Sequence, residues 1–163
     1  MNTRSKILDR ASCLAFVKQA RSKGIKVGFT NGCFDILHVG HVRYLFQARE
    51  MADLLVVAIN SDASVRANKG PDRPVFPENE RAELLAGLEC VDAVVIFGEP
   101  SVLDLVKQVK PDVLVKGSDW PEDGVVGREF VESIGGKVVR MPLTEGASTT
   151  TIINRIKKLS ARS

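Results

Sequence analysis

Histidine is almost absent from this chain, and its scarcity narrows the possible chemistry. Only two histidines, His38 and His41, occur in 163 residues. A catalytic zinc ion typically needs three protein ligands and a structural one needs four, so we predict no metal ion held by side chains. A nucleophilic Ser–His or Cys–His pair is also disfavoured, because the sequence contains no supporting signature such as G-x-S-x-G.

Cysteine is rare too, and it shows no pairing pattern. The three cysteines, Cys13, Cys33 and Cys90, are odd in number and none belongs to a C-x-x-C motif. This usage is typical of reduced thiols and predicts a cytoplasmic protein. We interpret Cys33 as a small buried filler rather than as a nucleophile.

Long apolar runs and blocks of like charge are also missing. No segment approaches the roughly 20 apolar residues that span a bilayer, and the N-terminal sequence MNTRSKILDR has no signal-like apolar core. The net charge is only +3, without the basic stripe of a nucleic-acid binder. We therefore expect neither a membrane nor a nucleic acid as partner, and small-molecule substrates instead.

Apolar, β-branched runs alternate with helix-like segments along the chain. Strands are predicted at 25–31, 54–60, 93–97, 112–116 and 137–141. Helices are predicted at 12–22, 40–51, 63–68, 78–88, 101–109, 128–134 and 148–159. Continuously apolar runs such as 54–59 favour parallel strands covered on both faces. The pattern predicts a single Rossmann-like, doubly wound α/β domain over residues 1–163 with a five-stranded parallel sheet. An N-terminal helix would lie within 1–24 and a catalytic core within 25–158.

The first informative motif is TNGCFDILHVGH at residues 30–41. It follows a predicted strand and delivers His-x-Gly-His to the start of a predicted helix. A glycine permits close approach of the backbone, and the free N–H groups of a helix N-terminus bind phosphate. The segment therefore predicts a phosphate site, while helix capping alone is the alternative interpretation.

A second motif, TEGASTTT at residues 144–151, precedes the last predicted helix. Four consecutive hydroxyl residues are more than one N-cap requires, although Ser148 as a simple cap is the alternative. Both motifs, and KGSDW at 116–120, follow predicted strands. Because the carboxyl ends of parallel strands meet at one edge, we expect one composite site there, suited to a triphosphate.

Together the motifs resemble the H-x-G-H nucleotidyltransferases, in their cytidylyltransferase-like branch. The resemblance covers roughly residues 25–158 and includes NKGPDRPV at 68–75 and R-x-E-L-L-x-x-L-x-x-V-D at 81–92. It is strongest to the enzymes that transfer AMP from ATP to D-glycero-β-D-manno-heptose 1-phosphate. Bifunctional members of that group carry a sugar kinase ahead of this domain. Since the chain begins at Met1, we expect a stand-alone transferase, and the resemblance further implies a homodimer.

Two features keep other acceptors open. The heptose enzymes usually read K-G-G-D-Y where this chain has KGSDW, and Trp120 is similar to the glycerol-3-phosphate cytidylyltransferases. Those enzymes have an arginine at the position of Leu143, which argues against that branch. An FMN adenylyltransferase is another alternative, and a nucleotide-binding regulator without turnover is the alternative outside enzymes.

The resemblance implies roles for individual residues. The catalytic positions are His38, His41 and Lys69. The nucleotide-binding positions are Thr30, Asn31, Gly32, Phe34, Gly40, Lys116, Gly117, Asp119, Gly146, Ser148, Thr149 and Thr150. The acceptor-binding positions are Asp35, Asn60, Asp62, Arg66, Trp120 and Arg128. For most of the acceptor set a solvated polar face is the alternative. Mg²⁺ would bridge the phosphates of ATP with few protein ligands of its own.

Several of these residues have two interpretations. Asp35 would either face the acceptor or order its loop, and Trp120 would either stack on a ring or cover the pocket. Lys69 is the family's lysine against the triphosphate or a solvated loop lysine. Arg81 and Arg128 lie near helix starts, where the helix dipole disfavours cations, so we expect an anionic partner for each.

Overall fold

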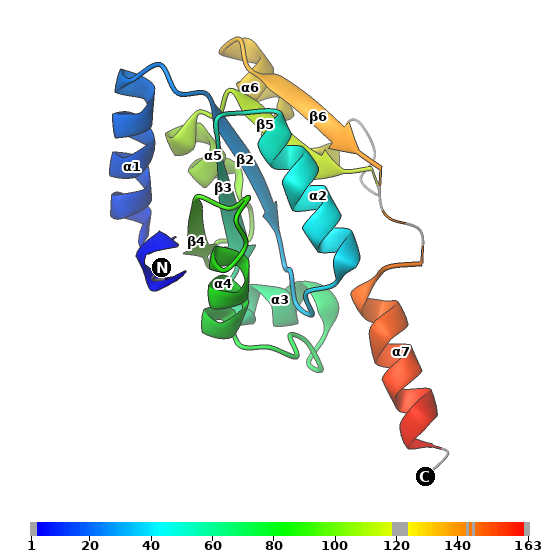
Figure 1. Ribbon diagram of the computed structural model, residues 1–163. Coiled ribbons are helices and arrows are strands. Elements are labelled where there is room, and N and C mark those ends of the chain that lie inside the picture. Colours follow the sequence, from blue (N-terminus) through cyan, green and yellow to red (C-terminus); the bar gives the residue numbers. More distant parts are fainter. Residues whose placement is uncertain (1–2, 119–123, 143, 145, 162–163) are drawn as a thin grey trace.

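A parallel sheet of six strands runs through the computed structural model, which describes residues 3–118, 124–142, 144 and 146–161 (Figure 1). The strands are β1 (Ile7–Leu8), β2 (Val27–Gly32), β3 (Leu54–Asn60), β4 (Ala93–Phe97), β5 (Val113–Gly117) and β6 (Lys137–Met141). Their order across the sheet is β1-β4-β3-β2-β5-β6. After β2, the strands β3 and β4 are added in turn on one side of β2. The chain then crosses over, and β5 and β6 are added on the other side of β2. The switch point, where such folds bind ligands, therefore lies between β2 and β5.

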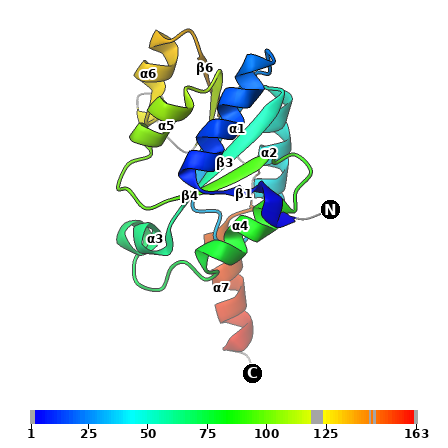
Figure 2. The same ribbon diagram turned by 90° about the vertical axis from the view of Figure 1, so that its left-hand side faces the viewer.

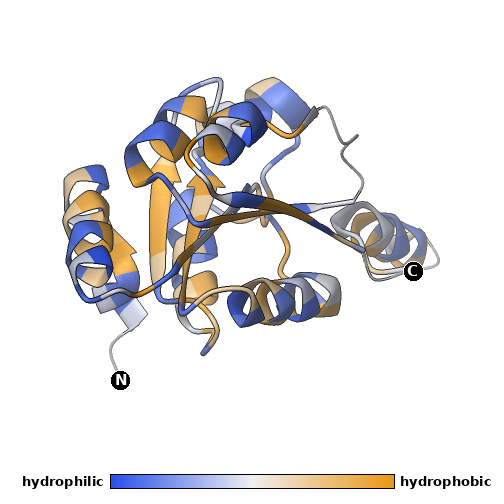
Figure 3. Ribbon diagram, turned by 90° about the horizontal axis from the view of Figure 1, so that it is seen from above, coloured by the Kyte–Doolittle hydropathy of each residue, from blue (hydrophilic) through white to orange (hydrophobic). Residues whose placement is uncertain are grey.

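Helices cover both faces of this sheet (Figures 2 and 3). The helices are α1 (Arg10–Ser22), α2 (Val39–Glu50), α3 (Asp62–Lys69), α4 (Glu78–Ala86), α5 (Leu103–Val109), α6 (Arg128–Ser133) and α7 (Thr149–Ser160), with a 3-10 turn at Thr3–Lys6. Buried residues of α1, α5 and α6 pack on one face, and those of α2 and α4 pack on the other. The predicted parallel, doubly wound architecture is thereby confirmed.

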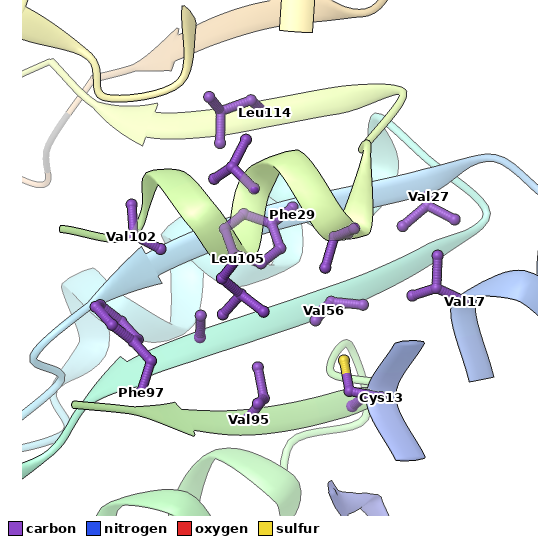
Figure 4. Packing of buried hydrophobic residues seen from close by; sticks show 14 of the residues in the cluster. Cys13, Val17, Val27, Phe29, Val56, Val95, Phe97, Val102, Leu105 and Leu114 are labelled. Atoms are coloured by element: carbon purple, nitrogen blue, oxygen red, sulfur yellow. The ribbon is translucent and has the colours of Figure 1, made fainter. Parts of the chain in front are cut away.

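The central strand β3 shows why the fold forms. All seven of its residues are buried, because helices cover the sheet on both sides. Alternate side chains of β3 pack on opposite faces of the sheet. Val56 belongs to the same cluster as Phe29 and Leu105, on the face covered by α1 and α5 (Figure 4). Val57 belongs to the same cluster as Leu45, on the face covered by α2. A continuously apolar sequence is what such two-sided burial requires.

The predicted number of strands was wrong. A sixth strand, β1, pairs with β4 at the edge of the sheet, with Ile7 opposite Val94 and Leu8 opposite Val95. Two residues are too few to produce a detectable period, so the sequence pattern could not indicate this strand. It is fixed by tertiary contacts instead, including hydrogen bonds from the Lys6 ammonium to the carbonyls of Leu88 and Val91.

The burial pattern of α2 predicts unequal effects of two neighbouring truncations. Leu45 is fully buried, so Leu45→Ala should lower the free energy of unfolding by about 2–5 kcal/mol. The next residue, Phe46, is 44% exposed, and Phe46→Ala is the matched control with a loss below about 1 kcal/mol. Urea denaturation of both variants measures the difference, and losses of equal size would contradict this orientation of the helix.

Candidate active site

The two histidines lie side by side at the start of α2, immediately after the loop that follows β2. Their rings are stacked, with 3.8 Å between the ring centroids and 22° between the ring planes. His38 occupies the N-cap position in an extended conformation, but its side chain makes no capping hydrogen bond. The buried Nδ1 atoms of both rings lack a hydrogen-bond partner among the described residues. The helix start is thus left open to an anion.

Burial favours the neutral form of both imidazoles. Burial lowers the pKa of His41 to about 4, and the adjacent His38 adds to this effect, while the backbone of Ile36 opposes it. Burial also lowers the pKa of His38. Neutral rings side by side avoid the repulsion between two cations. A bound polyphosphate would supply negative charge and thereby raise the pKa of both rings.

Gly40 brings the two sequence motifs into contact. A Cβ atom at this position would lie 3.0 Å from the His38 ring and 3.1 Å from the Cβ atom of Ala147. The segment that precedes α7 therefore packs against the first turn of α2, as the ribbon shows (Figure 1). Two helix N-termini meet at one place, and each contributes free backbone N–H groups.

Ser148 is the N-cap of α7, which matches the capping interpretation of its hydroxyl. Its Oγ accepts a hydrogen bond of 3.0 Å from the backbone N–H of Thr151 and lies 2.8 Å from the Thr151 hydroxyl. Thr149 and Thr150 form the first turn of the helix, and Gly146 precedes it with a φ of +73°, a conformation that suits glycine.

Asp35 orders the loop between α3 and α4. Its carboxylate is buried and accepts hydrogen bonds from the backbone N–H groups of Val75 and Phe76, at 2.7 and 3.0 Å, and from the guanidinium of Arg73. Of the two interpretations of Asp35, the structure thus shows the ordering of a loop. The same loop follows Lys69, the last residue of α3, so Asp35 connects the histidine loop to the segment that carries this lysine.

The guanidinium of Arg81 is fully buried and joins four segments around the site. It donates hydrogen bonds to the carbonyls of Phe76 at 3.0 Å, Cys33 at 2.7 Å and Asn60 at 2.9 Å, and to the carboxylate of Asp62 at 2.7 Å. The anionic partner expected for this arginine is therefore within the chain. Sequence reasoning missed this structural role, although one signal existed: the arginine lies four residues before Leu85, on the buried face of α4.

The polar residues at the switch point pair with one another. Lys116 at the end of β5 donates hydrogen bonds of 2.9 Å to the backbone carbonyl and to the side-chain oxygen of Asn31 on β2. Thr30 is fully buried, with its hydroxyl 2.7 Å from that of Tyr44. The side chain of Thr30 thus belongs to the core, whereas Lys116 and Asn31 line the predicted edge.

The remaining predicted positions differ in how close they lie to the histidines. Phe34 meets His41 edge-on at 5.1 Å between centroids, and a Cβ atom on Gly32 would lie 3.0 Å from the Phe34 ring. Burial raises the pKa of the Cys33 thiol, and the positive charge of Lys69 partly opposes this rise, so Lys69 lies near the histidine loop.

Two predicted acceptor residues lie on the surface of helices. Arg66 is exposed on α3. Arg128 is on α6, in the layer opposite to α2, and its guanidinium meets the carboxylate of Glu132 at 3.1 Å, so it too has an anionic partner within the chain. Gly117 ends β5, whereas Asp119 and Trp120 lie outside the described residues.

Comparisons with known proteins show the family of this chain. The family model of cytidylyltransferase-like proteins matches residues 29–155. The chain is 53% identical over 152 residues to "Bifunctional protein HldE" of Syntrophotalea carbinolica, an alignment that covers 93% of this chain and 31% of that protein. For the protein of the same name from Geobacter sulfurreducens the identity is 54% over 138 residues, covering 85% and 28%. The chain thus spans about a third of the length of these curated relatives.

Solved structures show the same architecture. A lipopolysaccharide core biosynthesis protein from Thermoplasma volcanium is 31% identical with a TM-score of 0.62, covering 74% of this chain and 98% of that one. A pantoate-beta-alanine ligase from Francisella tularensis shares the fold at 18% identity, with a TM-score of 0.61 and coverage of 85% and 67%. Among the helices that the structure describes, none combines the length and apolar character that a membrane span requires.

Two helix N-termini and a histidine pair meet at this edge of the sheet, an arrangement suited to binding phosphate. The family model covers most of the chain, and the chain therefore belongs to the cytidylyltransferase-like family.

The close approach at Gly40 predicts that even a methyl group there impairs the site. Gly40→Ala pushes the new Cβ against the His38 ring and Ala147, so turnover should fall at least about tenfold. Gly98→Ala is the matched control, because its Cβ would meet only the Ser61 hydroxyl at an ordinary 3.5 Å. Steady-state kinetics and thermal melting of both variants measure the effect. Normal turnover in Gly40→Ala would contradict the packing of the two motifs.

The lowered pKa of His41 predicts a pH-dependent loss of stability. The histidine titrates near 6.5 in the unfolded chain and near 4 in the folded chain. Between these values the unfolded chain binds more protons, so stability falls as the pH falls. At pH 5 the contribution amounts to at most about 2 kcal/mol. Urea denaturation at pH 7.5 and pH 5 should therefore show a larger loss for the wild type than for His41→Gln, and equal losses would refute a depressed pKa.

Proposed function

We propose that this protein transfers AMP from ATP to a sugar 1-phosphate, D-glycero-β-D-manno-heptose 1-phosphate, and releases pyrophosphate. The observation that carries the proposal is the meeting of two helix N-termini around the His38–His41 pair at the switch point of the sheet. The likeness to the bifunctional HldE proteins over 93% of the chain supports the heptose acceptor.

In the proposed reaction, a phosphate oxygen of the sugar 1-phosphate attacks the α-phosphorus of ATP. The bond between this phosphorus and the bridging oxygen to the β-phosphate breaks in line with the attack, and pyrophosphate leaves. The attacking oxygen is already anionic near neutral pH, so no protein base is required. Catalysis then consists of positioning and of stabilising the charge on the five-coordinate phosphorus.

Each part of the site has a proposed role in that scheme. His38 and His41 donate hydrogen bonds to the α- and β-phosphates, and their place at the start of α2, where His38 makes no capping hydrogen bond, supports this role. The first turn of α7, with Ser148 and Thr149, binds the β- and γ-phosphates through its backbone N–H groups. Lys69 adds positive charge from the end of α3. Asp35 and Arg81 act as positioning residues, because they fix the loops on which these groups stand.

Mg²⁺ is the cofactor that we propose, and it enters with the nucleotide. The described residues contain no group of three or more His, Cys, Asp or Glu side chains that could hold a metal ion. We propose that the ion is bound mainly through phosphate oxygens, the usual mode for Mg²⁺. When bound, the ion neutralises charge on the triphosphate. His38, His41 and the first turn of α7 are the residues that would hold those phosphates.

Further proposals concern the acceptor side and the state of the protein. We propose that Asn60, Asp62, Arg66 and Trp120 form the acceptor side, together with Arg128; Asp62 and Arg128 are its weakest members, because they pair with Arg81 and Glu132. We also propose one catalytic unit over residues 25–158, which the family match over 29–155 supports. A cytoplasmic homodimer is proposed as well, and the three free cysteines support the reducing compartment.

A substrate panel tests the function directly. Purified protein with Mg²⁺ and ATP, CTP, GTP or UTP is mixed with the heptose 1-phosphate, glycerol 3-phosphate or FMN, and pyrophosphate release is followed. We expect release with ATP and the heptose alone. His41→Ala should remain folded and lose more than about 10²-fold in turnover, the scale of one lost transition-state donor.

Other outcomes assign the protein differently. Release with CTP and glycerol 3-phosphate would mean that Trp120 is a better guide to the acceptor than Leu143. Release with ATP and FMN would point to the flavin branch. No release in any tube from folded protein would support a nucleotide-binding regulator, and near-normal turnover of His41→Ala would contradict the catalytic site.

A further inference from the structure

The last helix, α7, leaves an apolar stripe uncovered. It extends away from the sheet and its helical layers (Figures 1 and 2), and none of its residues is buried. The stripe consists of Ile152, Ile153, Ile156 and Leu159, and the last two are 54% and 57% exposed. A helix of twelve residues is marginal in water without tertiary packing. We therefore expect this apolar stripe to pack against another protein surface.

The charge around this stripe has one sign. At 100° per residue, Arg155 and Lys157 flank the stripe on its two sides. The helix Thr149–Ser160 contains no acidic residue. A matching surface would therefore combine an apolar floor with an acidic rim.

Such a surface lies along α4. An apolar groove, here called the α4 groove, is lined by Leu37, Phe76, Leu84 and Leu88, with Glu80 and Glu83 among its lining residues. Leu84 is 44% exposed and both carboxylates are exposed, although Glu83 also meets Arg4 at 3.7 Å. Groove and helix are thus complementary in apolar character and in charge.

The geometry points to a second copy of this chain as the occupant. The helix α7 begins where Ala147 packs against Gly40, and from there it runs away from its own α4 (Figure 1). In this position, none of its residues lines its own α4 groove. We propose that two copies exchange these helices, so that α7 of each copy lies in the α4 groove of the other.

Two-fold symmetry suits this exchange. Leu37, which lines the α4 groove, is one residue before His38, and α7 starts three residues after Gly146, next to Ala147, which packs against Gly40 in the first turn of α2. Both surfaces therefore flank one end of the molecule, where a two-fold axis can pair them simultaneously in an isologous contact. Each copy then holds the helix whose first turn belongs to the other copy's phosphate site. The inference rests on the homodimer proposed above, but not on the identity of the nucleotide or the acceptor.

Single substitutions test the two surfaces separately. We expect the wild type to sediment as a dimer in analytical ultracentrifugation without any substrate. Ile156→Glu on the helix and Leu84→Glu in the groove should each give a folded monomer, checked by circular dichroism. Phe46→Glu, an exposed apolar position of α2 outside both surfaces, is the matched control and should remain dimeric.

Mixing the two monomeric variants distinguishes exchange from other interfaces. Ile156→Glu keeps an intact groove and Leu84→Glu keeps an intact helix, so their mixture should form a heterodimer through one native contact. Dimerisation of Leu84→Glu alone would overturn the proposal in favour of packing between two α7 stripes. A wild type that is monomeric at all concentrations, or a mixture that stays monomeric, would also overturn it.

Charge exchange provides a second test at the same interface. Glu80→Arg and Arg155→Glu should each weaken the dimer at least about tenfold at low salt, and the double variant should recover most of the loss. No recovery would refute the proposed charge pairing of the rim with α7. Because these measurements follow mass alone, they remain informative even if the substrate panel assigns another reaction.

Discussion

The buried guanidinium of Arg81 is the contact on which the site depends. It reaches the loop after β2, the end of β3, the start of α3 and the segment before α4, with four hydrogen bonds of 2.7 to 3.0 Å. A buried cation is costly unless it is paired and fully hydrogen-bonded. Here three carbonyls and Asp62 satisfy it, so the loops at this edge of the sheet are held in one relative arrangement.

Next to these fixed loops, polar atoms of the site itself have no hydrogen-bond partner among the described residues. The two neutral imidazoles stack without hydrogen bonds to their buried Nδ1 atoms, and the helix starts of α2 and α7 face one another across Gly40. The open helix starts and the two Nδ1 atoms without a partner among the described residues favour an anionic ligand. The arrangement is organised in advance, because Asp35 and Arg81 fix the loops before any nucleotide binds.

The limits of sequence reasoning follow from the range of each signal. Long apolar strands such as β3 were predicted with their observed bounds, because continuous burial leaves a clear pattern. The strand β1 was missed, since a two-residue edge strand has no period. The motif at 144–151 could be recognised by type, but the sequence did not show that the Ser148 hydroxyl accepts a hydrogen bond from the backbone N–H of Thr151.

The sequence by itself determined the class of fold, the order of its elements and the residue types that gather at the switch point. Periodicity and the ordered motifs depend only on neighbours in the chain, so they are visible without a structure. Only the tertiary structure decided which polar side chains remain available for a ligand. Asp35, Asp62 and Arg81 look alike in sequence as charged site candidates, yet all but one of the partners described above lie 19 to 48 residues away. Such pairings arise when the sheet brings distant loops together, and no local pattern encodes them.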